Sequence, residues 1–172
     1  MPTEEKSAVD LDKLLAKWAR DRLGDIGVWE SVHDQFEKWS AKIISDLKET
    51  YSDIAIRLFL NPVDMGKPED YTASAVIKGE CGDTIGIYLR TDKGIIKEAF
   101  FTTDGCESSV AACGGLVEMI KGMSEEDAAG LCGWDVLEYL GVFPEDSAHC
   151  CLLAVNTLKK ALGAIGASPS IQ

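Results

Sequence analysis

The sequence predicts an α+β fold, in which one run of strands lies between two runs of helices. Three observations support this class. Residues 72–102 alternate apolar and polar side chains with a period of two, which is typical of half-buried strands. The segments before and after this region carry apolar residues at helical spacing. The strand-like segments also follow one another through short connections, which favours an antiparallel meander.

The strands can be placed from this alternation. The three expected strands are residues 73–78, 84–89 and 95–102. Cys81-Gly82 lies in the turn between the first two, where glycine gives the backbone conformational freedom. Asp92-Lys93-Gly94 is typical of a hairpin turn and separates the second strand from the third. We therefore expect three antiparallel strands in chain order.

The flanking helices are indicated by apolar spacing and by helix-start signals. Ser124 and Asp127 have the spacing of a capping box, which predicts a helix start. The expected helices run from Tyr51 to Leu60, from Glu107 to near Gly122, from Ser124 onward, over a short stretch after Cys132, and from about Ala148 to Ile165.

The first 50 residues are predicted to be a helical N-terminal extension. Asp10 is a candidate cap for a first helix, and a second helix carries apolar residues spaced alternately three and four apart. These are Trp29, Val32, Phe36, Trp39 and Ile43. We expect this face to pack on the main domain, with a homodimer through the N-terminal helices as the alternative. Residues 167–172 are expected to be a flexible tail.

Composition excludes several classes of function. The net charge is −12, with 17 basic and 29 acidic side chains, so a nucleic-acid backbone would be repelled. Neither a membrane-spanning run nor a signal peptide is recognisable, so we expect a cytoplasmic protein that binds no membrane. Thiols stay reduced there, and six cysteines then indicate metal or sulfur chemistry rather than disulfides. The alternative is that the cysteines are small core residues.

Five residues in three separate stretches are the candidate metal ligands. They are Cys81, Asp83, Cys106, His149 and Cys150. Each stretch falls at the edge of an expected strand or helix. Three thiolates, one carboxylate and one imidazole form a borderline-soft set that suits zinc, or iron with sulfide, better than magnesium or calcium. If the fold brings these stretches together, the protein holds a metal centre.

The other three cysteines fit a structural role better. Cys113 shares a helical stripe with Val110 and Val117, and Cys151 lies on the apolar face of the last helix. Both are predicted to be core residues. Cys132 stands at a helix start and stays ambiguous between the two roles.

From Tyr51 onward the chain resembles the IscU/NifU-type iron–sulfur cluster assembly scaffolds. The shared signals are, in order, Tyr51-Ser52, Asn61-Pro62 with Gly66, Cys81-Gly82-Asp83, Gly105-Cys106, Lys121-Gly122 and His149-Cys150. The resemblance implies a three-stranded antiparallel sheet covered by helices over residues 51–166, with residues 1–50 as an addition. The family's chaperone-recognition motif is absent, because the segment before His149 is Val142-Phe143-Pro144-Glu145-Asp146-Ser147-Ala148.

The resemblance also implies a function. A cysteine desulfurase would supply sulfur, and Cys81, Cys106 and Cys150 would ligate a transient [2Fe–2S] cluster built with iron and passed to apo acceptor proteins. Asp83 would be the weaker ligand that keeps the cluster transferable, and His149 an alternative ligand. Zinc would fill the site when no cluster is present. Such a protein is a carrier rather than an enzyme. A zinc-binding persulfide relay that never holds a cluster remains the alternative.

Overall fold

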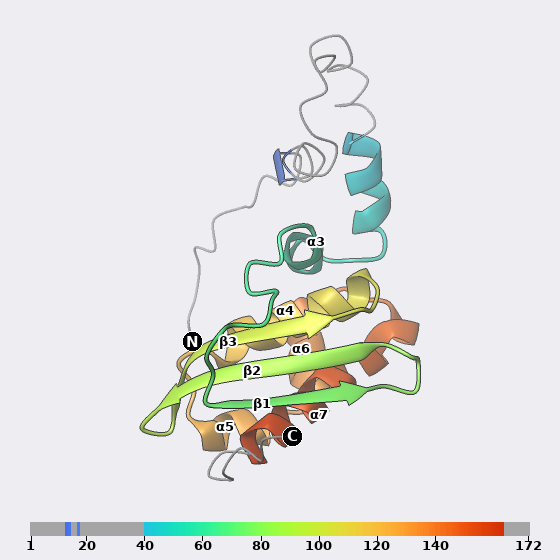
Figure 1. Ribbon diagram of the computed structural model, residues 1–172. Coiled ribbons are helices and arrows are strands. Elements are labelled where there is room, and N and C mark those ends of the chain that lie inside the picture. The colour runs from blue at the N-terminus through green and yellow to red at the C-terminus, as the bar shows by residue number, and fades with distance from the viewer. Residues whose placement is uncertain (1–12, 15–16, 18–39, 164–172) are drawn as a thin grey trace.

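The computed structural model describes residues 13–14, 17 and 40–163. Residues 40–48 are helical. The elements that follow are α3 (Asp53–Leu60), β1 (Ala73–Lys78), β2 (Thr84–Asp92), β3 (Ile95–Thr103), α4 (Glu107–Ile120), α5 (Glu125–Gly130), α6 (Gly133–Leu140), the 3₁₀ turn η1 (Glu145–Ser147) and α7 (Ala148–Gly163) (Figure 1). None of the helices in these described residues combines the length and apolarity that a bilayer span requires.

The sheet has the predicted topology. Its strands lie in the order β1-β2-β3, and both neighbouring pairs are antiparallel. Lys93 and Gly94 form the β2–β3 hairpin with φ angles of 50° and 76°, which explains the glycine at the second position. The prediction of an α+β fold with three antiparallel strands is confirmed.

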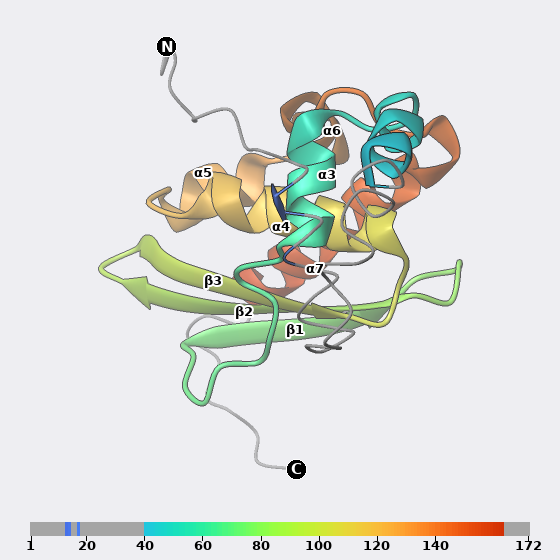
Figure 2. The same ribbon diagram turned by 90° about the horizontal axis from the view of Figure 1, so that it is seen from above.

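Helices cover one face of this sheet. Figure 2 shows α3, α4 and α6 together on one side of it. Ile85, Ile87 and Leu89 of β2 are completely buried, because alternate residues of a strand point to the same face and meet the helices there. Helix α7 packs against β1 and β2 as well as against α4 and α6. The core therefore lies between the sheet and this helical layer.

Polar contacts join the helices of that layer. Arg57 of α3 donates two hydrogen bonds to the carboxylate of Glu118 of α4, each of 2.8 Å. The Tyr139 hydroxyl of α6 donates to the same carboxylate at 2.7 Å. Such a bidentate arginine–carboxylate pair has a defined geometry, so it orients the three helices relative to one another.

Side-chain caps start two of the helices. Ser52 accepts a hydrogen bond from the backbone of Ala55 at the start of α3, and its hydroxyl donates to the carbonyl of Leu140. Ser124 accepts from the backbone of Asp127 at the start of α5. The predicted start at Ser124 is therefore confirmed.

Residues 40–48, from the predicted N-terminal extension, pack on α3. Ile44 is buried in a small cluster with Ile56 and Leu60 of α3, and Ile43 and Leu47 pack at its edge. The other predicted members of the apolar face, Trp29, Val32, Phe36 and Trp39, lie outside the described residues, as do Asp10 and residues 167–172. The homodimer through these helices stays a prediction.

Two cysteines belong to the hydrophobic core, as predicted. Cys113 of α4 and Cys151 of α7 are completely buried. Burial raises the pKa of both thiols, that of Cys151 from 9.0 to about 12, because the thiolate would lose its hydration. The nearby Cys150 adds to both increases.

These raised pKa values predict a loss of stability in alkaline solution. The folded state keeps the thiol protons of Cys113 and Cys151 to higher pH than the unfolded chain does. Their contribution is therefore complete below the unfolded pKa and is lost as pH rises above it. We expect deprotonation of each thiol to lower the free energy of unfolding by on the order of 1 kcal/mol near pH 10.

Urea unfolding in reductant, at about pH 8 and about pH 10, measures this loss. The loss of unfolding free energy between the two pH values should be smaller in Cys151→Ala, by on the order of 1 kcal/mol. It should not change in Cys132→Ala, which removes an exposed thiol instead. An equal pH difference in wild type and Cys151→Ala would contradict the prediction.

Candidate metal centre

Three chain segments that are distant in sequence meet at one end of the sheet. They are the β1–β2 turn, the junction of β3 with α4, and the first turn of α7 (Figure 1). Antiparallel pairing places the end of β1 and the end of β3 on either side of the start of β2. Helix α7 then brings its N-terminal turn to the same end. The fold thus brings together the three stretches singled out in the sequence.

The β1–β2 turn carries Cys81 and Asp83. The backbone of Gly79 donates to Asp83 O at 2.8 Å, and Gly82 donates to Gly79 O at 3.1 Å. Gly82 has a φ of 98°, a conformation that favours glycine. A Cβ on Gly79 would lie 2.7 Å from Leu153 Cδ2, so the turn is packed closely on α7. Cys81 itself is exposed.

Cys106 is the N-cap residue of α4, as predicted from its place after the third strand. Its thiol is exposed and makes no capping hydrogen bond. The preceding Gly105 has a steric role. A Cβ added there would overlap Asp83 Oδ2 and would lie 2.6 Å from Ser109 Oγ. The absence of a side chain at Gly105 thus leaves room for the Asp83 carboxylate.

His149 and Cys150 occupy the first turn of α7, as predicted. His149 Nδ1 is 2.7 Å from Asp146 O, and a carbonyl can only accept, so Nδ1 carries the proton. The other ring nitrogen, Nε2, lies 3.6 Å from Cys150 Sγ. The imidazole is exposed, whereas Cys150 is only 2% exposed.

Ser109 joins two of these segments, and the sequence analysis missed it. This buried serine of α4 donates to Asp83 Oδ2 at 2.6 Å, and its Oγ lies 3.4 Å from Cys150 Sγ. Its position three residues after Cys106, one helical turn later, is the only signal in the sequence. A serine in a helix is so common that this spacing has little predictive value.

The electrostatics of Cys150 reflect the convergence. Burial raises the pKa of its thiol, and negative charge on Cys106, Asp83 and Cys81 raises it further. The thiol of Cys150 is thus influenced by both other candidate thiols. A cation that binds Cys150 must displace the thiol proton. Because the pKa of this thiol is raised, protons compete with the cation up to a higher pH than at an ordinary thiol.

The side chains do not form a closed cage. In the part of the chain that the structure describes, no group of three or more His, Cys, Asp or Glu side chains is arranged to hold one metal ion. The chemistry of the donors nevertheless fits zinc or iron, because it combines thiolates with a carboxylate and an imidazole. The exposed thiols of Cys81 and Cys106 can turn without disturbing the core. The ligand roles of the five residues stay a prediction.

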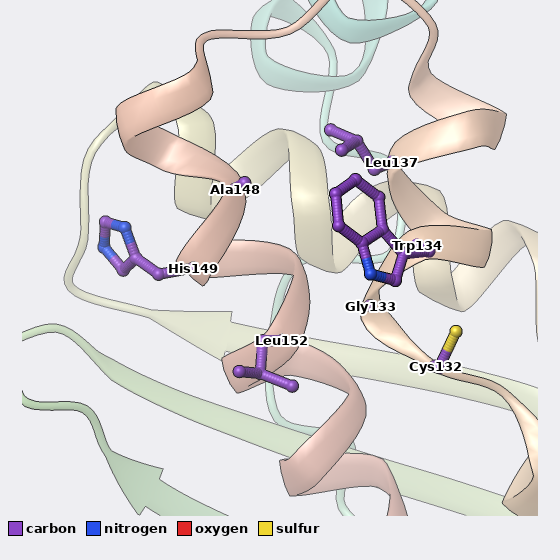
Figure 3. Close-up of a pocket in the computed structure, with 7 residues that line it drawn as sticks. All are labelled: Cys132, Gly133, Trp134, Leu137, Ala148, His149 and Leu152. Carbon is purple, nitrogen blue, oxygen red and sulfur yellow. The ribbon is translucent and has the colours of Figure 1, made fainter.

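A groove of about 320 Å³ adjoins the site between α6 and α7. It is lined by Cys132, Gly133, Trp134, Leu137, Ala148, His149 and Leu152 (Figure 3). Trp134 is 76% exposed. Figure 3 shows the ring of His149 directed away from Trp134, and Cys132 on the α6 side of the groove. Cys132 is the N-cap of α6, and its backbone donates to Asp135 at 2.6 Å.

The structure thus combines a helix-covered antiparallel meander with three cysteines near one end of the sheet. The chain belongs to the NifU-like N-terminal domain family, whose model matches residues 50–169. This membership confirms the resemblance stated from the sequence.

Three relatives illustrate the relationship. The iron-sulfur cluster assembly scaffold protein IscU 1 of Archaeoglobus fulgidus is 34% identical over 113 residues, which cover 65% of this chain and 74% of that protein. The scaffold protein IscU of Escherichia coli K12 is 32% identical and covers 65% of this chain and 91% of that protein. The nitrogen fixation protein NifU of Trichormus azollae is 31% identical, but the match spans only 40% of its length.

Solved structures support the fold. The N-terminal NifU-like protein of Brucella abortus matches with a TM-score of 0.57 and 15% identity, over 72% of this chain and 99% of that one. A SUF-system scaffold protein from Fervidobacterium islandicum AW-1 matches with a TM-score of 0.56 and 21% identity, over 65% of this chain and 96% of that one. At these identities the likeness shows a shared fold alone.

The contact between Gly105 and Asp83 yields a prediction. In Gly105→Ala the new methyl group would displace the Asp83 carboxylate from Ser109. We expect zinc affinity to fall by about tenfold, in the range of lost outer-shell contacts. Competition with a chromophoric chelator measures this affinity. Gly130→Ala is the matched control, because a Cβ there meets nothing within 4 Å. Equal affinity in the two variants would refute the steric argument.

Proposed function

We propose that this protein is a scaffold on which iron–sulfur clusters are assembled before transfer to other proteins. The named roles of the IscU relatives support this function, and so does membership of the same family. The protein would act as a carrier, and the cluster would be its cargo. Because the chain spans about two fifths of the NifU relative, the proposal concerns this domain and not the other activities of a longer protein.

The observation that carries the proposal is the unequal exposure of the three converging thiols. Cys150 is buried beside Asp83 and Ser109, whereas Cys81 and Cys106 are exposed. Exposed thiols can receive sulfur from a partner and later exchange their ligand with an acceptor. A buried thiol gives the cargo one ligand whose position is fixed by the surrounding core. A structural zinc site would instead be closed and tetrahedral.

The finer features of the proposal follow from the donor set. We infer a transient [2Fe–2S] cluster bound by Cys81, Cys106, Cys150 and Asp83, with His149 as an alternative ligand. Thiolates hold iron and sulfide well, and a carboxylate is a harder and more replaceable ligand. The same donors suit zinc in the absence of a cluster. The proposed partners are a cysteine desulfurase and apo acceptor proteins, and the proposed location is the cytoplasm.

Anaerobic reconstitution with iron, sulfide and a desulfurase tests the function. We expect visible thiolate-to-iron absorption in the wild-type protein and at least a tenfold lower yield in Cys81→Ala, Cys106→Ala and Cys150→Ala. Cys132→Ala should retain the full yield, because that exposed cysteine is the N-cap residue of α6 and comes from none of the three segments of the site.

The reconstitution also separates the scaffold from a zinc-binding persulfide relay. A relay would bind zinc and stimulate the desulfurase without developing the visible absorption. That outcome with the wild-type protein would overturn the scaffold function. Equal yields in Cys132→Ala and Cys150→Ala would overturn the assignment of the site.

A further inference from the structure

The Ser109 hydroxyl lies between two candidate ligands that come from different segments. It donates to Asp83 Oδ2 at 2.6 Å, in the β1–β2 turn, and lies 3.4 Å from Cys150 Sγ, in α7. Ser109 itself belongs to α4 and is completely buried. One hydroxyl group therefore connects a turn and two helices at the point where the three ligand-bearing segments meet.

The contacts of the Ser109 hydroxyl with Asp83 and Cys150 differ in strength. A serine hydroxyl has one proton and two acceptor lone pairs, so it cannot donate to Asp83 and Cys150 at once. The contact to the carboxylate is short and charge-assisted, which makes it the stronger of the two. The proton therefore lies toward Asp83 Oδ2. Among the described residues, no hydrogen bond is made to Asp83 Oδ1, which leaves that oxygen free to bind a cation.

The space around the hydroxyl is restricted as well. Gly105 leaves a gap that the Asp83 carboxylate and Ser109 Oγ fill together, since a Cβ there would clash with both. The carboxylate is thus held by a hydrogen bond on one side and by the bare backbone of Gly105 on the other. Its orientation is fixed before any cation arrives.

We propose that Ser109 is a positioning residue that orients Asp83 for cargo binding. The inference rests on the proposed function, because it concerns the same site. Carboxylates that bind metals are usually held by outer-shell hydrogen bonds, and removal of such a partner weakens metal binding by about 10- to 100-fold. Ser109 supplies this hydrogen bond to Asp83 from within the core.

Zinc binding by the complete, reduced protein tests the proposal, with a chromophoric chelator as competitor. We expect Ser109→Ala to weaken zinc binding by at least about tenfold. Ser108→Ala is the matched control. Ser108 is also buried and lies next to Ser109, but its hydroxyl is paired with that of Tyr51 at 2.8 Å. Zinc affinity should change less than about twofold in this control.

A double-mutant cycle distinguishes positioning from a general structural effect. If Ser109 acts through Asp83, Ser109→Ala should cause little further loss once Asp83→Ala is present. A structural effect would instead give additive losses in the double variant. Additive losses would overturn the proposal.

A second pair of variants separates the loss of the hydroxyl group from a folding defect. Ser109→Thr and Ser109→Val give side chains of the same shape that differ in the hydroxyl group. We expect the threonine variant to bind zinc about tenfold more tightly than the valine variant. Equal affinities would refute the role of the hydroxyl.

The two proposals fail in different ways. Wild-type zinc binding that does not respond to Cys81→Ala, Cys106→Ala or Cys150→Ala would refute the site itself. Zinc binding that is lost in Cys150→Ala but is unchanged in Ser109→Ala would refute only the role of Ser109.

Discussion

The packing of α7 against the sheet and α4 is the constraint on which the site depends. The buried face of this helix includes Cys151, Ala154, Val155, Leu158 and Ala161. Consecutive residues of a helix diverge by about 100°, so burying Cys151 in the core turns Cys150 toward its edge. That edge is where Ser109 of α4 and Asp83 of the β1–β2 turn lie. Core packing thus determines where the buried thiol of the site points.

This constraint gives the site a buried part and an exposed part. Asp83 and Cys150 contact the buried Ser109, whereas Cys81 and Cys106 are exposed at a turn and at a helix start. A cysteine has one side-chain torsion to its sulfur, so little conformational entropy is lost when an exposed thiol turns to bind a cation. The open arrangement of the described side chains fits a carrier, which must both bind and release its cargo.

The elements of the fold were predictable because their signals are local. The period-two alternation of residues 72–102 arises from burial of one strand face. Asp92-Lys93-Gly94 favours a hairpin turn through its own residues, without contacts from elsewhere in the chain. The candidate ligands were recognisable because thiols at the edges of elements are uncommon.

Contacts between segments were not predictable. Ser109 gained its role only through tertiary contacts, and the clash that excludes a side chain at Gly105 depends on Asp83, 22 residues earlier in the printed sequence. Burial of Ile44 is a second example. The apolar spacing in the sequence includes its neighbour Ile43, but packing on α3 buries Ile44 more deeply. Such contacts require the fold before they can be recognised.

Helix α4 links the site to the rest of the domain. Its neighbouring serines point in different directions: Ser109 toward Asp83, and Ser108 toward the hydroxyl of Tyr51, just before α3. Further along, the carboxylate of Glu118 binds Arg57 of α3 and Tyr139 of α6. A rotation of α4 would break these contacts together, because a helix transmits rotation along its length. Contacts with α3 and α6 therefore hold the helix that carries Ser109, and Ser109 holds the Asp83 carboxylate.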